Sequence, residues 1–307
     1  MLAVQPIFIA PATEASLFEK AVCLTLTTGR FGNTRKAPIT NVQVQADKTR
    51  LRLSKQLLVC LELDKIESFD NALRTWTQSR CLPMPAFKGS YVLPLGAVEE
   101  VNERLERAEK QERPALVEDF CRTYPDAVEQ ARLDLGDLFD PANYPGLGRV
   151  RAMFYIDYRY FSLSTPSKLR DFSVTLFREE RDKAARLWQE TMEEGQQYLR
   201  NLLLETVKHA RERLEAGTDG KPKVFRNSLV KNINDFLDTF QIRNIADDRE
   251  LAGLVEEMRR LASGVGAEDL RSDDKLRQAW AGELTRIERS LASMVIDKPT
   301  RRITFDD

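Results

Sequence analysis

The chain has 307 residues, of which 42% are hydrophobic and 31% are charged, and its formal net charge is −1. This composition is typical of a folded, helix-rich protein, and a charge so close to zero provides no global field for attracting nucleic acid or membranes. No apolar run reaches the roughly 18 residues of a membrane span, so we expect none. The apolar N-terminus is interrupted by prolines and is a poor signal peptide, which favours a cytoplasmic protein.

Strand and turn patterns dominate residues 13–46. Residues 22–28 alternate in polarity and are rich in β-branched side chains, and residues 39–44 alternate again. The glycine-containing segment 29–33 between them is typical of a turn. The sequence therefore predicts an N-terminal β-hairpin.

The predicted hairpin carries the strongest local charge signal, because the stretch from Lys20 to Lys55 holds eight basic residues and one acidic residue. A turn that presents cations and an aromatic ring is suited to contact phosphates or an acidic surface. The alternative is a solvated loop beside an acidic neighbouring domain. The candidate contact residues are Arg30, Phe31, Arg35 and Lys36.

Helical patterns follow as far as residue 136, with Ser54 as the expected N-cap of the first helix. Residues 90–94 are expected to form one short strand. The helical ranges are 54–80, 97–111, 114–124 and 126–136.

The proline- and glycine-rich segment 140–148 is the clearest loop in the chain. It predicts a boundary between an N-terminal mixed domain, residues 1–140, and a C-terminal domain, residues 149–307. The C-terminal domain is expected to begin with an alternating strand over 149–163.

A very long helix is predicted for residues 165–216, with Thr165 as N-cap and Pro166 in the first turn. A helix of about 50 residues would be about 75 Å long. Shorter helices, expected at 224–240, 248–262 and 274–295, cannot cover all of it. The charged segment 177–186 is the part expected to remain solvated. Asp247 and Glu250 resemble a capping box, and residues 296–305 are expected to add a final strand.

Signals for catalytic chemistry are sparse. The single histidine, His209, falls within the long helix, and the four cysteines form no C-x-x-C pair, so we expect buried reduced thiols and no zinc or redox site. Phosphate-binding glycine loops and a nucleophile elbow are also missing from the sequence, so we expect no cofactor and no catalytic residues. The remaining enzyme hypothesis is a metal site formed by Asp134, Asp137 and Asp140, against the alternative that these carboxylates cap and end helices.

Several stretches resemble an uncharacterised family of bacterial and phage proteins. They are ALRTW (72–76), GSYVLP (89–94), YP (124–125), LGDLF (135–139), NYP (143–145), GKPKVFR (220–226) and RNI (243–245). Members of this family are commonly encoded beside MoxR-type AAA+ ATPases and von Willebrand factor A-domain proteins. The resemblance implies an accessory role with one of these as partner, and it brings no known catalytic residues.

These observations predict an α+β protein that is mostly helical, with a small N-terminal mixed domain and a C-terminal helical bundle built on the long helix. The leading functional hypothesis is a non-enzymatic adaptor for a AAA+ machine, related to phage biology or anti-phage defence, which self-associates through the long helix or binds a partner. The alternative is a nucleic-acid-binding protein that uses the basic hairpin. The predicted partner contact is the tip between two helices: Lys221, Lys223, Phe225 and Arg226.

Overall fold

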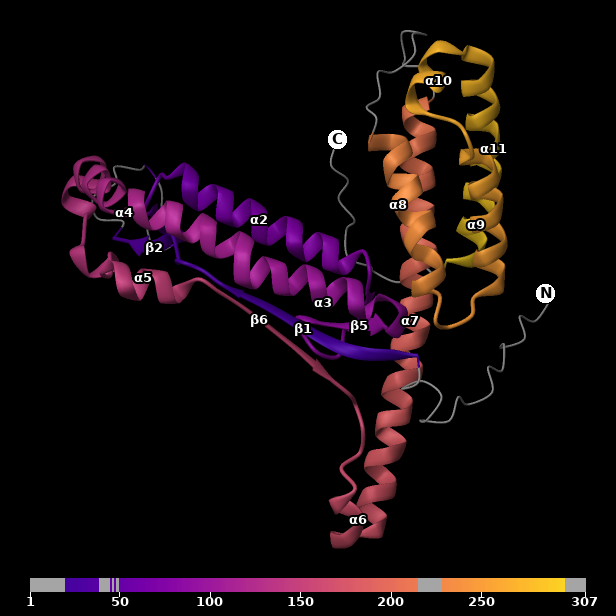
Figure 1. Cartoon of the computed structure of the whole chain (residues 1–307), viewed down its shortest axis with the longest axis horizontal. Coiled ribbons are helices and arrows are strands. Elements are labelled where there is room, and N and C mark those ends of the chain that lie inside the picture. Colours follow the sequence, from indigo (N-terminus) through magenta and orange to yellow (C-terminus); the bar gives the residue numbers. More distant parts are fainter. Residues whose placement is uncertain (1–19, 39–44, 46, 48–49, 215–227, 296–307) are drawn as a thin grey trace. The chain divides into compact units, whose positions relative to one another are not determined.

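The computed structural model describes residues 20–38, 45, 47, 50–214 and 228–295 (Figure 1). Short strands are confined to the part before residue 162, and long helices dominate the rest. The predicted class is therefore confirmed: the fold is α+β, mostly helical, with a small sheet region towards the N-terminus and a C-terminal helical region built around one long helix.

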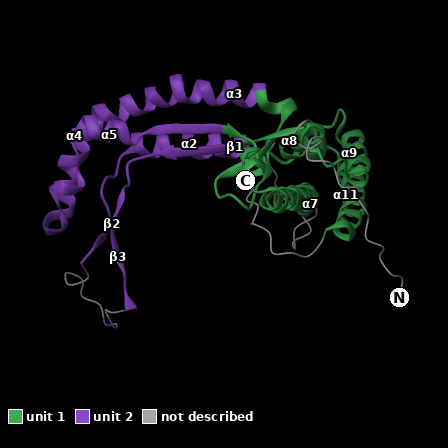
Figure 2. Cartoon of the chain, turned by 90° about the horizontal axis from the view of Figure 1, so that it is seen from below, with its two compact units in different colours: residues 1–24, 78–98, 160–307 green, residues 25–77, 99–159 purple. Residues whose placement is uncertain are grey.

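The chain forms two compact units, and each is assembled from separate stretches of sequence (Figure 2). The first unit contains residues 1–24, 78–98 and 160–307, and the second contains residues 25–77 and 99–159. The chain therefore passes from one unit to the other four times. The segment 140–148, which the sequence suggests as a boundary, lies inside the second unit.

A four-stranded sheet has the order β4-β5-β1-β6. β4 and β5 are antiparallel, with Leu82 opposite Val92. The structure confirms the strand predicted at 90–94, and the strand predicted at 22–28 lies within β1. The other strand of the predicted hairpin, 39–44, lies outside the described residues. The bounds of the four strands are Ala21–Gly29 (β1), Leu82–Pro83 (β4), Ser90–Pro94 (β5) and Tyr155–Phe161 (β6).

A separate two-stranded ribbon pairs β2 (Thr34–Ala37) with β3 (Leu53–Gln56). The prediction that a helix begins at Ser54 is therefore wrong, and α2 begins only at Leu61 and ends at Gln78. The leucine spacing that favours a helix is satisfied differently here, because Leu57 and Leu58 follow the strand and are both buried in the core of the second unit.

One helical run extends from residue 98 to residue 135. It comprises α3 (Val98–Arg107), a π-helical turn η4 (Ala108–Glu112) and α4 (Arg113–Leu135). The predicted separation into three helices is wrong, because Pro125 is accommodated within α4. The predicted strand over 149–163 is also partly wrong, because α5 (Leu147–Met153) occupies its first residues before β6.

The long helix α7 runs from Val174 to Leu214 and contains 41 residues, which corresponds to about 60 Å. It is shorter than predicted because a separate short helix, α6 (Lys168–Phe172), precedes it. Ser173 has an extended backbone between the two helices, and its Oγ accepts a hydrogen bond of 3.2 Å from Leu176 N. Ser173, and not Thr165, therefore caps the long helix.

Shorter helices pack beside the C-terminal part of α7 (Figure 1). Asp248 is the N-cap of α9, since its carboxylate accepts a 3.1 Å hydrogen bond from Leu251 N; the predicted cap, Asp247, precedes it with a φ of 54°. The sequence patterns do not predict the short α10, and the predicted strand 296–305 lies outside the described residues. The helices are α8 (Ser228–Arg243), α9 (Arg249–Ala262), α10 (Ala267–Ser272) and α11 (Asp274–Met294).

Candidate functional site

The β2–β3 ribbon in the second unit places positive charges directly opposite each other. Its register pairs Arg35 with Lys55 and Lys36 with Ser54. Directly opposite residues of an antiparallel pair share a face and lie about 4.5–5.5 Å apart at their Cβ atoms. Like charges at such positions destabilise the pair, so this arrangement favours binding of an anion between Arg35 and Lys55.

The base of the ribbon is fixed by hydrogen bonds from a single asparagine. Asn33 accepts the Leu57 N–H at its backbone oxygen and the Leu58 N–H at Oδ1, both at 2.8 Å, and its Nδ2 donates to Leu58 O. Nearby, Arg35 Nη1 donates to the carbonyl oxygens of Gly32 and Thr34 at 2.8 and 2.9 Å. A Cβ at position 32 would lie 3.1 Å from that nitrogen, so glycine suits this close approach.

The segment 136–145 forms a wall beside the ribbon and is held by two tyrosines. Tyr144 Oη donates to Leu57 O at 3.0 Å, and Tyr124 Oη donates to Pro145 O at 2.9 Å. Burial raises the pKa of Tyr124 to about 12, so its hydroxyl keeps the donated proton at neutral pH. The Tyr144 ring stacks on Phe139 with 4.8 Å between centroids.

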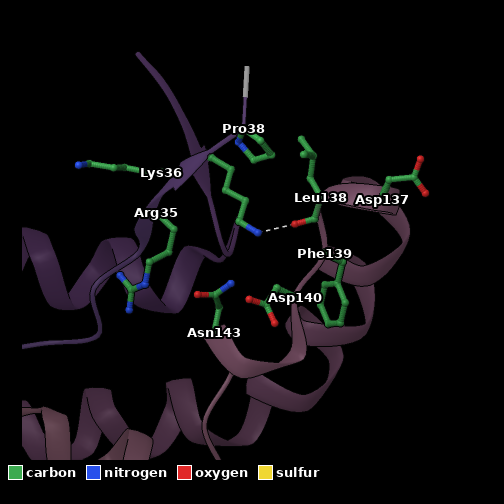
Figure 3. A pocket seen from close by; sticks show the side chains of 9 residues that line it. Arg35, Lys36, Pro38, Asp137, Leu138, Phe139, Asp140 and Asn143 are labelled. Carbon is green, nitrogen blue, oxygen red and sulfur yellow. Dashed lines mark hydrogen bonds between the residues drawn. The ribbon is translucent and has the colours of Figure 1, made fainter. Parts of the chain in front are cut away.

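Ribbon and wall enclose an open pocket of about 550 Å³ (Figure 3). Lys55 Nζ donates to Leu138 O and so joins the two sides. Asp140 and Asn143 lie side by side in Figure 3, whereas the side chains of Lys36 and Asp137 extend away from them in opposite directions. The lining residues are Arg35, Lys36, Pro38, Lys55, Asp137, Leu138, Phe139, Asp140 and Asn143.

The polar groups of the pocket do not neutralise one another. Within the described residues, neither Arg35 nor Lys36 nor Lys55 has a carboxylate within ion-pair distance. The Asp140 carboxylate accepts a 3.0 Å hydrogen bond from Ala142 N, which lies in a 3-10 turn (Pro141–Asn143). The pocket therefore offers cationic donors on the ribbon side and an acceptor with an amide on the wall side.

Two of the four predicted hairpin residues line this pocket, namely Arg35 and Lys36. Arg30 instead forms a 3.0 Å ion pair with Glu67. Phe31 is buried in the core of the second unit, and its ring meets that of Tyr124 edge-on at 6.3 Å. The prediction of Phe31 as a surface contact residue is wrong, because a ring packed in the core is not available for stacking on a base.

The predicted aspartate cluster is not assembled. Asp134 lies in α4 and accepts a hydrogen bond from Gln130, whereas Asp137 and Asp140 line the pocket. Across the part of the chain that the structure describes, no group of three or more histidine, cysteine or carboxylate side chains is placed to hold a metal ion. The three-aspartate metal site is therefore contradicted by the geometry.

The first unit presents a different kind of surface at the beginning of α7. None of the side chains from Val174 to Leu187 is buried, whereas from Trp188 onwards the buried positions recur every three or four residues. The sequence predicts a solvated segment at 177–186, and the structure confirms it. Phe172, just before this helix, is 85% exposed.

The remaining predicted positions divide into two groups. All four cysteines are buried and free, as predicted, and burial raises the pKa of Cys23 to about 11 and that of Cys81 to about 12. His209 lies within α7, also as predicted. The predicted contact at Lys221, Lys223, Phe225 and Arg226 falls outside the described residues and stays a prediction.

Sequence reasoning does not select Lys55 and Asn143 as site residues. In the sequence, Lys55 is only one of several basic residues, and its role depends on the strand register. Asn143 lies far along the chain, in a segment that the sequence identifies only as a loop. The signal that could have identified Lys55 is the short alternating segment 53–56, which the helical leucine spacing conceals.

Among the helices of the described residues, none combines the length and the apolar character needed to cross a bilayer. No protein-family model, curated protein or solved structure matches this chain.

Proposed function

We propose that this chain is a non-enzymatic adaptor that presents the uncovered beginning of α7 to a protein partner. One observation carries the proposal: Val174–Leu187 buries no side chain, although the same helix forms the spine of a core from Trp188 onwards. Helices in proteins are stabilised mostly by packing of an apolar face. A helix extended for about four turns beyond its core is therefore suited to binding something else.

Charge pairs support the uncovered segment in the absence of a partner. Lys183 Nζ lies 2.6 Å from Glu180 Oε1, and Arg181 pairs with Asp182 at 3.3 Å. Such exposed pairs contribute little stability, about 0–1 kcal/mol each. Phe172 adds an exposed aromatic ring, and aromatic residues are enriched among the energetically dominant residues of protein interfaces.

The identity of the partner rests on the sequence resemblance. It favours a MoxR-type AAA+ ATPase or a von Willebrand factor A-domain protein, with a second copy of the chain as the alternative occupant of α7. The contact predicted at residues 221–226 is a further proposal. Reversal of two of its charges, Lys223→Glu with Arg226→Glu, should weaken partner capture without lowering thermal stability.

The test is capture of partners by the tagged full-length chain from its native host, with nuclease treatment and identification by mass spectrometry. We expect a AAA+ ATPase or an A-domain protein to be recovered with the wild type and lost with Phe172→Asp. The matched control is Val59→Asp, because Val59 is also 85% exposed but lies in the second unit. Both variants should keep the wild-type melting temperature.

Equal recovery with Phe172→Asp and Val59→Asp would reject the uncovered end of α7 as the contact surface. Recovery of nucleic acid alone, abolished by nuclease and by high salt, would reject the adaptor function itself.

A second candidate function is nucleic-acid binding, favoured by the directly opposed Arg35 and Lys55. Binding through phosphate contacts weakens steeply with salt. Retention of a short DNA or RNA oligonucleotide by the full-length chain should then fall as salt rises. For Arg35→Gln, the slope of log affinity against log salt should decrease by about one.

A further inference from the structure

The pocket between ribbon and wall combines both signs of charge in a way that selects among ligands. Arg35 and Lys55 project from paired positions on the ribbon, and Asp140 and Asn143 line the wall. Asp137 adds a second carboxylate to the lining. A ligand that fits must therefore supply negative charge on one side and a hydrogen-bond donor on the other.

We propose that this pocket binds the carboxylate of an extended peptide segment of a partner protein. Arg35 and Lys55 hold the carboxylate, since a guanidinium can donate two parallel hydrogen bonds to it. Asn143 donates to a peptide carbonyl, and the oxygen of Asp140 that does not cap Ala142 accepts a peptide N–H. This inference rests on the proposed adaptor function and assigns it a second contact.

The ribbon geometry supports a peptide as the ligand. β2 and β3 form a sheet of only two strands, so each has one neighbour and one outer edge. An outer edge presents backbone N–H and C=O groups that an extended chain can pair with, while a neighbouring pocket takes a side chain or a terminus. Arg35 and its exposed neighbours Thr34 and Lys36 lie on one such edge strand.

The charge balance disfavours a polyanion in the same place. Three cations and two carboxylates line the pocket, and the whole chain has a net charge of −1. A nucleic-acid backbone would bring several phosphates past Asp137 and Asp140, whereas a single carboxylate needs to meet only the cations. The nucleic-acid alternative is therefore an outcome that the test must be able to detect.

The test measures the fluorescence anisotropy of rhodamine-labelled probes with the full-length chain. The probes are a pool of uncharged hexapeptides with free C-terminal carboxylates, the same pool as C-terminal amides, an amide pool that contains one glutamate, and a short single-stranded DNA. We expect a carboxylate-bearing pool to bind about tenfold tighter than the uncharged amide pool. The two carboxylate pools distinguish a terminal carboxylate from a side-chain carboxylate.

Variants then locate the binding. Arg35→Gln and Asn143→Asp should each abolish the preference for the carboxylate pool. The matched control is Arg149→Gln, because Arg149 is exposed in the same unit but does not line the pocket. It should bind like the wild type, and thermal melting should show that all three variants fold.

Three results would overturn the proposal: equal binding of carboxylate and amide pools, equal effects of Arg35→Gln and Arg149→Gln, or tighter binding of DNA than of any peptide pool. None of them decides the adaptor function, since partner capture through Phe172 depends on the other unit.

Discussion

At the scale of single residues, two buried arginines illustrate opposite solutions to burying a charge. Arg113 is 2% exposed and pairs with the fully buried Asp70 through Nε and Nη2 at 2.8 and 2.9 Å, and Nη2 also donates to Gly29 O at 2.7 Å. Arg243 is 1% exposed, and its Nη1 has no hydrogen-bond partner among the described residues. Burial lowers the pKa of Arg243 to about 10, although its guanidinium stacks on Phe236 at 5.3 Å.

Substitution by methionine should therefore have opposite effects at the two positions. Arg113→Met leaves Asp70 buried without its cation and should destabilise the protein by about 3–5 kcal/mol. Arg243→Met removes an unsatisfied buried donor and should stabilise it by about 1 kcal/mol. Urea unfolding followed by circular dichroism measures both changes, and destabilisation by Arg243→Met would show that its charge is compensated.

At the scale of elements, α7 illustrates what local periodicity predicts. The spacing of apolar residues correctly indicates the helix and its core-facing stripe, and the charged composition of 177–186 correctly indicates where packing stops. The predicted start is wrong because the signals at Thr165 and Pro166 are local, whereas Ser173 is the residue that caps the helix. Within the stripe, Gly195 permits close packing against β4, since a Cβ there would lie 3.0 Å from Leu82 Cδ1.

Glycine substitutions should reveal this close packing. Gly195→Leu would insert a side chain where Leu82 already lies, and we expect a loss of about 1–3 kcal/mol in the free energy of unfolding. Gly282 in α11 is exposed, and a methyl group added there would meet no atom within 4 Å, so Gly282→Ala should gain about 0.5–1 kcal/mol from helix propensity. Chemical denaturation compares the two, and a neutral Gly195→Leu would mean that β4 moves away freely.

The β2–β3 ribbon shows what local patterns miss. The leucines at 57 and 58 sit at helical spacing from Leu61, so residues 54–60 resemble the beginning of α2. Their actual conformation is determined by pairing with residues 34–37 and by hydrogen bonds to Asn33, all far back in the sequence. The pocket depends on still longer separations, since Lys55 meets Leu138 across 83 positions. Arg35, Lys36, Asp137 and Asp140 could be identified as candidates from sequence, but their assembly could not.

At the scale of the whole molecule, the two units are interleaved along the sequence. The core of the first unit combines residues from β1, β4 and β5 with the helices after residue 160. Leu82, Met84 and Val92 are each nearly inaccessible and pack in the same cluster as Trp188 and Leu203. A contiguous C-terminal fragment therefore lacks part of the core that its own helices need.

A fragment of residues 149–307 should consequently fail to fold as the first unit does. It lacks the buried side chains of β4 and β5, which leaves apolar surface on α7 exposed. We expect far-ultraviolet helical signal without a cooperative thermal transition, and enhanced binding of a hydrophobic dye. A sharp transition with the melting behaviour of the intact chain would contradict this expectation.

The π-helical turn η4 separates what this protein tolerates by letter from what it tolerates by length. Of its five residues, only Ala108 is buried. A π turn contains one residue more than an α turn, and the loss of one residue would rotate everything after it by about 100° around the helix axis. Arg113 follows immediately and would turn away from Asp70. Natural variants are therefore expected to exchange Glu109, Lys110 and Gln111 freely, whereas insertions and deletions there should be eliminated by selection.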